Sequence, residues 1–167
     1  MGEPPLVVTL QLDEQAQQHF EALRREHFPP DRLQVGAHLT LFHALPGEHL
    51  MSVLQDLHAL APPSFPLSVT RVRPLGRGVV YELRAPQLQQ LHGELTRRWA
   101  PWLTRQDAQP LSAHVTVQNK VTPEAARALL IELSAGFVPY EVQAVALRLW
   151  RYLGGPWELL ASVPLPS

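Results

Sequence analysis

The chain has 167 residues, 46% of them hydrophobic and 17% charged, and its 14 basic and 15 acidic residues give a formal net charge of −1. This composition is typical of a folded domain, and the near-neutral charge argues against a dedicated duplex-DNA binder. The absence of cysteine excludes disulfides, thiolate nucleophiles and cysteine-ligated metal centres. No apolar run approaches the ~20 residues of a membrane span, and no basic segment precedes an apolar stretch near the start. We therefore expect a cytoplasmic monomer that binds neither membranes nor duplex DNA.

In the first half of the chain, strands and helices alternate. Asp13 is expected to cap the first helix, which ends near Phe28 because Pro29 and Pro30 cannot continue it. The apolar periodicity predicts, in chain order, a strand over 5–12, a helix over 13–28, a strand over 38–45, a helix over 48–60 and a strand over 65–74.

A glycine-containing turn at residues 76–78 joins the two halves and predicts a hairpin between the strands on either side. The remaining elements are expected to be a strand over 79–84, a helix over 86–99, a strand over 114–121, a helix over 122–134 and strands over 140–152 and 156–164. The order strand, helix, strand, helix, strand thus occurs twice. We interpret residues 1–167 as one domain with two approximate repeats, 5–75 and 78–164.

The equivalent strands of the two halves begin with the same four-residue pattern of histidine, apolar residue, threonine and apolar residue. These tetrads are His38-Leu39-Thr40-Leu41 and His114-Val115-Thr116-Val117. Because side chains alternate along a strand, the histidine and threonine of each tetrad share one face and the aliphatic pair lies on the other. The composition predicts about 0.07 such tetrads by chance, so two at matching places form the strongest signal in the sequence.

Two imidazoles on opposite sides of a phosphorus atom can divide the proton transfers, because each titrates near neutral pH. Threonine hydroxyls can donate to the non-bridging phosphate oxygens. His38 and His114 are therefore the candidate acid and base, and Thr40 and Thr116 the candidate phosphate ligands. We expect no metal and no cofactor, since the tetrads lack the spacing of a zinc site. The alternative for either tetrad alone is an ordinary half-buried strand.

Two such tetrads in duplicated halves resemble the 2H phosphoesterases, the superfamily that includes the bacterial 2′-5′ RNA ligase and the cyclic nucleotide phosphodiesterases. The resemblance implies an α+β, bilobed fold with two mainly antiparallel sheets flanked by helices around a central cleft. It also implies metal-independent opening of 2′,3′-cyclic phosphates on RNA ends or small nucleotides to give 2′-phosphates, with reversible 2′-5′ ligation. The alternative function is a non-catalytic module that binds RNA ends in the same cleft.

The sequence departs from the family pattern after the second tetrad. RNA-ligase-like members often carry arginine five residues beyond the histidine, where this chain has Asn119. Lys120, the only lysine, either supplies the missing positive charge or lies on a solvated edge. Phe42 has the parity to face the cleft and stack on a base, with a core position as the alternative, and Tyr81 is a further candidate substrate contact. His43 has the opposite parity and is expected to lie at the surface or in packing.

Overall fold

The computed structural model describes residues 2–167, and its elements follow the expected order. The strands are β1 (Leu6–Leu12), β2 (Leu39–Leu45), β3 (Phe65–Leu75), β4 (Gly78–Arg84), β5 (His114–Gln118), β6 (Tyr140–Tyr152) and β7 (Trp157–Pro164). The α-helices are α1 (Glu14–His27), α2 (Leu50–Leu60), α3 (Pro86–Arg98) and α4 (Pro123–Ser134). The largest difference from expectation is in β5, which ends at Gln118 rather than continuing to residue 121.

Local capping residues begin two of these helices. The Asp13 side chain accepts a hydrogen bond from the Ala16 amide at 3.0 Å, as expected for the start of α1. The Thr122 hydroxyl accepts from the Ala125 amide at 3.2 Å, and Pro123 occupies the first position of α4, where no amide donor is needed. Short-range chemistry therefore sets where these helices begin.

All strand pairs are antiparallel, and the α+β class is confirmed. The strands expected in two sheets form one seven-stranded sheet in the order β2-β1-β6-β3-β4-β5, with β7 beside β6. The sheet is continuous because the long strand β6 pairs with β3 near the start of β6 and with β1 along most of its length. The pairing has an internal symmetry, since β1 lies between β2 and β6 as β4 lies between β5 and β3. The internal duplication itself stays a prediction.

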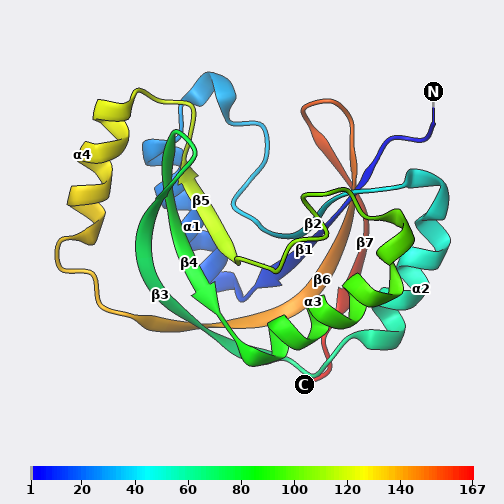
Figure 1. Ribbon diagram of the computed structural model, residues 1–167. Helices are drawn as coiled ribbons and strands as arrows, with labels where there is room; N and C mark the ends of the chain where they lie inside the picture. Colours follow the sequence, from blue (N-terminus) through cyan, green and yellow to red (C-terminus); the bar gives the residue numbers. More distant parts are fainter. Residues whose placement is uncertain (1) are drawn as a thin grey trace.

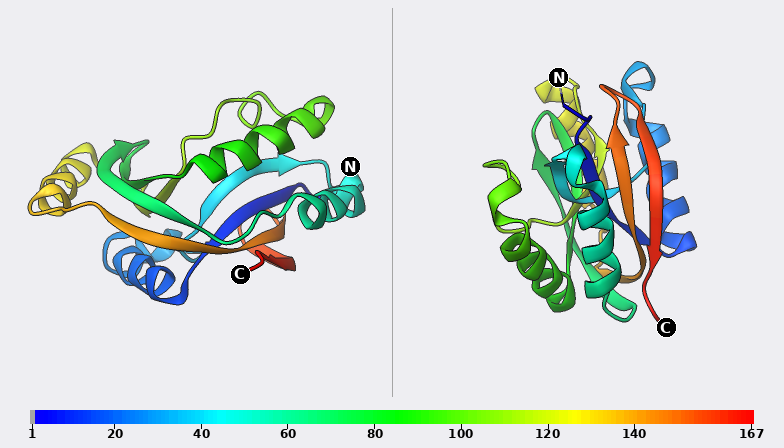
Figure 2. Two further views of the ribbon diagram at one scale, coloured as in Figure 1. Left: turned by 90° about the horizontal axis from the view of Figure 1, so that it is seen from below. Right: turned by 90° about the vertical axis from the view of Figure 1, so that its right-hand side faces the viewer.

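Each half of the sheet is covered by a helix from the other half of the chain. Phe20 of α1 contacts Tyr81 of β4 with ring centroids 5.5 Å apart, while Trp99, at the end of α3, contacts Phe42 of β2 at 5.0 Å. Figure 2 shows α1 and α3 on opposite sides of the sheet. The sheet curves strongly, so that its two outer strands approach each other (Figure 1). Among the described residues, no helix is long and apolar enough to cross a membrane.

Candidate active site

The second tetrad begins β5, and the first begins at His38, directly before β2; these two strands stand at the two ends of the sheet order. Curvature of the sheet brings these strands into contact, although they share no hydrogen-bonded ladder among the described residues. The aliphatic members of both tetrads are buried, whereas His38, Thr40, His114 and Thr116 are half-buried. Each tetrad therefore points its histidine and threonine away from the core.

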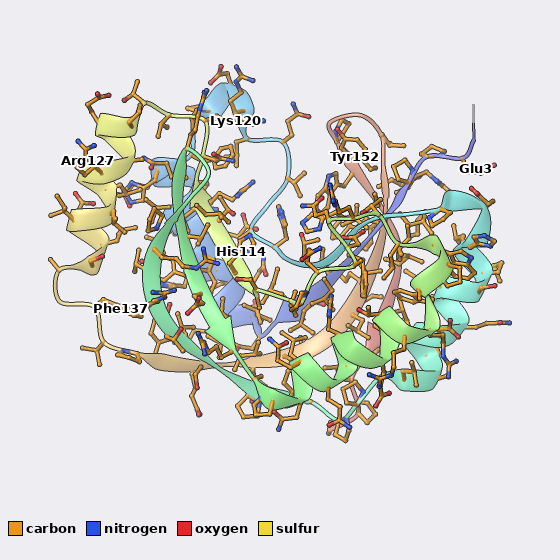
Figure 3. The ribbon with its side chains drawn as sticks, viewed as in Figure 1. Glu3, His114, Lys120, Arg127, Phe137 and Tyr152 are labelled. Carbon is orange, nitrogen blue, oxygen red and sulfur yellow. The ribbon has the colours of Figure 1, made fainter. Side chains whose placement is uncertain are left out.

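A hollow of about 300 Å³ brings together residues from both halves of the chain. It is lined by His38 of the first tetrad and Thr116 of the second, together with Lys120 and Trp157. The Trp157 ring covers His38, with the ring centroids 4.6 Å apart. His114 lies on the inner side of the curved sheet in Figure 3, and its charge acts on the pKa of His38. Each tetrad thus contributes one residue to this hollow, His38 and Thr116, whereas Thr40 and His114 are not among its lining residues.

Both histidines are held in the same tautomer by equivalent hydrogen bonds. Nδ1–H of His38 donates to the Gly36 carbonyl at 2.7 Å, and Nδ1–H of His114 donates to the Ser112 carbonyl at 2.8 Å. A carbonyl oxygen only accepts, so Nδ1 must carry the hydrogen in each ring. The neutral form of each imidazole therefore has its lone pair on Nε2, which is left to exchange protons with a ligand. Among residues 2–167, no three His, Asp or Glu side chains are grouped so that they could hold a metal ion.

The surroundings favour the neutral form of both imidazoles. Burial above all lowers the pKa of His38, the Gly36 carbonyl partly opposes this, and the nearby charges of Arg24, His114 and His43 add to the lowering, which brings the pKa to about 4. Burial also lowers the pKa of His114, again partly opposed by its backbone carbonyl, with further lowering by Arg73 and His43. At neutral pH His38 is consequently unprotonated in the free protein.

Arg24 of α1 connects the two halves of the site, and the sequence pattern alone did not single it out. Only 5% of this residue is exposed; its Nε donates to the Val35 carbonyl at 3.0 Å and its Nη1 to the Thr116 carbonyl at 2.7 Å. It therefore links the segment before His38 to the middle of β5. A signal was present in the sequence, because Arg24 continues the four-residue spacing of the buried residues Ala16 and Phe20 on α1.

A second arginine supports His114 from the neighbouring strands. Glu82 of β4 pairs with His114 in the sheet and accepts a hydrogen bond from Arg73 Nε at 3.2 Å. Arg73 Nη2 also donates to the Ser112 hydroxyl at 2.9 Å, and the carbonyl of Ser112 holds the His114 ring. The orientation of His114 is thus coupled to an ion pair on β3 and β4.

Asn119 holds the backbone of Lys120 in an unusual conformation. Lys120 has φ = 61°, and within residues 2–167 it is the only residue other than glycine with a positive φ. The Asn119 Oδ1 atom accepts hydrogen bonds from the Lys120 amide at 2.8 Å and from the Arg77 amide at 3.1 Å. Lys120 lies at the far end of β5 from His114 (Figure 3) and lines the hollow that contains His38. Lys120 is exposed and lines the same hollow as His38, and its role as the source of positive charge stays a prediction.

Two candidate substrate contacts lie in the hydrophobic core instead. Phe42 is fully buried, with its ring stacked 4.7 Å from that of His92 and 5.0 Å from that of Trp99. Tyr81 is buried among aromatic side chains, and burial raises its pKa above the ordinary value. Of the two alternatives for Phe42, the structure shows the core position. The expectation that Tyr81 contacts substrate is wrong, because its ring is occupied by core packing.

A β-bulge directly after each tetrad threonine explains the position of Phe42. In the register of β1 and β2, an advance of two residues along β2, from Thr40 to Phe42, lies opposite an advance of only one residue along β1. Strand β5 has the same irregularity after Thr116. The extra residue puts two consecutive side chains on the core side and shifts the alternation that follows. His43 and Asn119, each five residues after a tetrad histidine, therefore return to the side of the histidines. The parity expected for His43 was wrong for this reason, although its exposed side chain agrees with the expected position at the surface.

Comparisons with known proteins agree with this architecture. A family model for the 2′-5′ RNA ligase superfamily matches residues 12–156. Escherichia coli LigT complexed with 3′-AMP is similar at a TM-score of 0.67 and 19% identity, with 99% of each chain covered. TT0787 of Thermus thermophilus has a TM-score of 0.66 at 18% identity, covering 96% of this chain and 97% of that one. Kluyveromyces marxianus Usb1 has a TM-score of 0.53 at 13% identity, covering 98% and 99%. No curated protein gives a significant match.

Proposed function

This chain belongs to the 2′-5′ RNA ligase superfamily, and from that premise we propose that it is a phosphodiesterase that opens 2′,3′-cyclic phosphates of nucleotides or RNA ends. The observation that carries the proposal is the pair of imidazoles, one from each half of the chain, with Nδ1 tied to a backbone carbonyl and Nε2 left available. Solved structures of Escherichia coli LigT contain 3′-AMP, ATP and NADP+, which supports a nucleotide as the ligand class.

In the proposed reaction, His38 is the base and His114 the acid. His38 is unprotonated at neutral pH, so its Nε2 accepts a proton from water as the water oxygen bonds to phosphorus. The His114 imidazolium, which an anionic phosphate favours, donates its Nε2 proton to the ribose O3′ as the P–O3′ bond breaks. The product keeps the phosphate on the 2′ oxygen. A 5′-hydroxyl in place of water gives a 2′-5′ linkage by the same proton transfers.

Two kinds of side chain stabilise the charge that develops on the phosphate. The hydroxyls of Thr40 and Thr116 donate to the non-bridging oxygens, which become more negative in the transition state. The Lys120 ammonium supplies the positive charge for which the family often uses arginine, and Asn119 sets the backbone that aims it. Both threonines are half-buried, and Thr116 lines the hollow that contains His38.

The test is turnover of adenosine 2′,3′-cyclic phosphate and a cyclic-ended oligonucleotide by chelator-treated protein, with products separated by chromatography. His38→Ala and His114→Ala should each lower kcat by about 10²–10⁴-fold, because each removes one proton transfer. His58→Ala, which removes an exposed histidine of α2, is the matched control and should retain wild-type activity. Wild-type rates in both site variants would overturn the proposal, and binding of the cyclic end without any product would favour the non-catalytic alternative.

A further inference from the structure

His43 is a third histidine on the side of β2 that carries His38 and Thr40. The bulge after Thr40 turns it out of the core, and 44% of its side chain is exposed. The charge of His43 lowers the pKa of both His38 and His114, so it lies within electrostatic reach of the two proposed catalytic rings. The proposed reaction makes no use of this imidazole.

Asp107, in the loop between α3 and β5, fixes the orientation of His43. Only 3% of Asp107 is exposed, and its Oδ1 accepts from the His43 amide at 2.8 Å and from His43 Nδ1 at 3.1 Å. Its Oδ2 accepts from the His43 amide at 3.0 Å and from the Ala44 amide at 2.9 Å. Burial opposes ionisation, but these hydrogen bonds outweigh it and keep the pKa of Asp107 below its usual value. A buried carboxylate therefore holds Nδ1–H and leaves Nε2 of His43 for a ligand.

The position of His43 has a counterpart in the other half of the chain. His43 is the fifth residue after His38, as Asn119 is the fifth after His114, and the same bulge brings both out of the core. Asn119 directs Lys120 into the hollow at its own end of the paired strands. The Lys120 ammonium thus follows the second tetrad in the chain, and the His43 imidazole, held by the Asp107 carboxylate, follows the first.

We propose that His43, oriented by Asp107, binds a second phosphate of the substrate. The proposal rests on the proposed function, because a cyclic phosphate held between His38 and His114 determines where the rest of the nucleotide lies. With Nδ1 held by Asp107, Nε2 is the atom of His43 that faces a phosphate oxygen, and an anionic phosphate favours the form of the ring that donates Nε2–H. The protein consequently favours cyclic ends that carry a 5′-phosphate or a preceding nucleotide over nucleoside 2′,3′-cyclic phosphates.

Binding of two product-like ligands tests this directly, by calorimetry at fixed salt. The wild-type protein should bind adenosine 2′,5′-bisphosphate about tenfold more tightly than adenosine 2′-phosphate, as expected for one charge-assisted hydrogen bond. His43→Gln should abolish the difference and leave the affinity for the monophosphate within about twofold, while His43→Arg restores the preference because it restores a cation. His58→Gln, on the exposed face of α2, is the matched control and should keep the wild-type ratio.

The outcomes separate this inference from the proposed function. If wild-type protein binds both ligands equally, or if His43→Gln weakens both to the same extent, His43 has only a structural role at the edge of β2 and the inference is overturned. If the ratio depends on His43 but no cyclic phosphate is opened, the proposed function fails and the second-phosphate site stands. When both hold, kcat/KM for 5′-phosphorylated adenosine 2′,3′-cyclic phosphate should exceed that for the unphosphorylated substrate only while residue 43 is a cation.

Discussion

Replacing Arg24 with methionine should both destabilise the protein and misplace its active site. Methionine keeps the apolar stem but leaves the carbonyls of Val35 and Thr116 without their donor. Hydrogen bonds from a charged donor contribute about 1.5–3 kcal/mol each, so two lost bonds set an upper limit of about 6 kcal/mol. Burial lowers the pKa of Arg24, partly opposed by the charge of Glu21. The substitution therefore also removes a desolvation cost, and the net loss should be about 2–4 kcal/mol.

Urea denaturation and steady-state kinetics measure the two effects separately. With a slope of about 2 kcal/mol per molar, the loss corresponds to a midpoint lowered by about 1–2 M urea. The kcat/KM for a cyclic nucleotide should fall about 10–100-fold in conditions where the variant is folded, because the segment before His38 and the Thr116 strand are no longer fixed to each other. Arg24→Lys is the control and should be intermediate in both, since one ammonium cannot reproduce the planar fork. A variant with the wild-type midpoint and rate would refute the bridging role of Arg24.

Two further predictions concern the charges at the site. The kcat/KM of wild-type protein should be greatest on the acidic side of pH 6.5. His38 is unprotonated and able to act as base above about pH 4, whereas His114 is protonated and able to act as acid only below its pKa, which is itself lowered. A maximum above pH 8 in a pH–rate profile would contradict this assignment. Lys120→Gly should raise KM about tenfold through loss of the ammonium, without lowering stability, because glycine adopts a positive φ at no steric cost. An unchanged KM for this variant would remove Lys120 from the substrate site.

Elements controlled by short-range interactions were predictable from the sequence. The Asp13 cap and the proline-terminated end of α1 depend on groups only a few residues apart. The common face of His38 and Thr40 follows from the alternation of a strand, and the same holds for the second tetrad. Because the tetrad occurs twice at matching places, the sequence also predicted a site formed by two strands, and this prediction needs no knowledge of distances.

The sequence by itself therefore determined the order of the elements, the α+β class and the four residues proposed for catalysis, because alternation, caps and turns are local properties. Only the tertiary structure decided which residues complete the site. The bulges that bury Phe42 and expose His43 arise from register with a neighbouring strand, and register depends on contacts between distant segments. Arg24 similarly acquires its role from carbonyls on two other segments of the chain. Residues from these distant segments are brought together by the curvature of the whole sheet, and no local sequence pattern encodes that curvature.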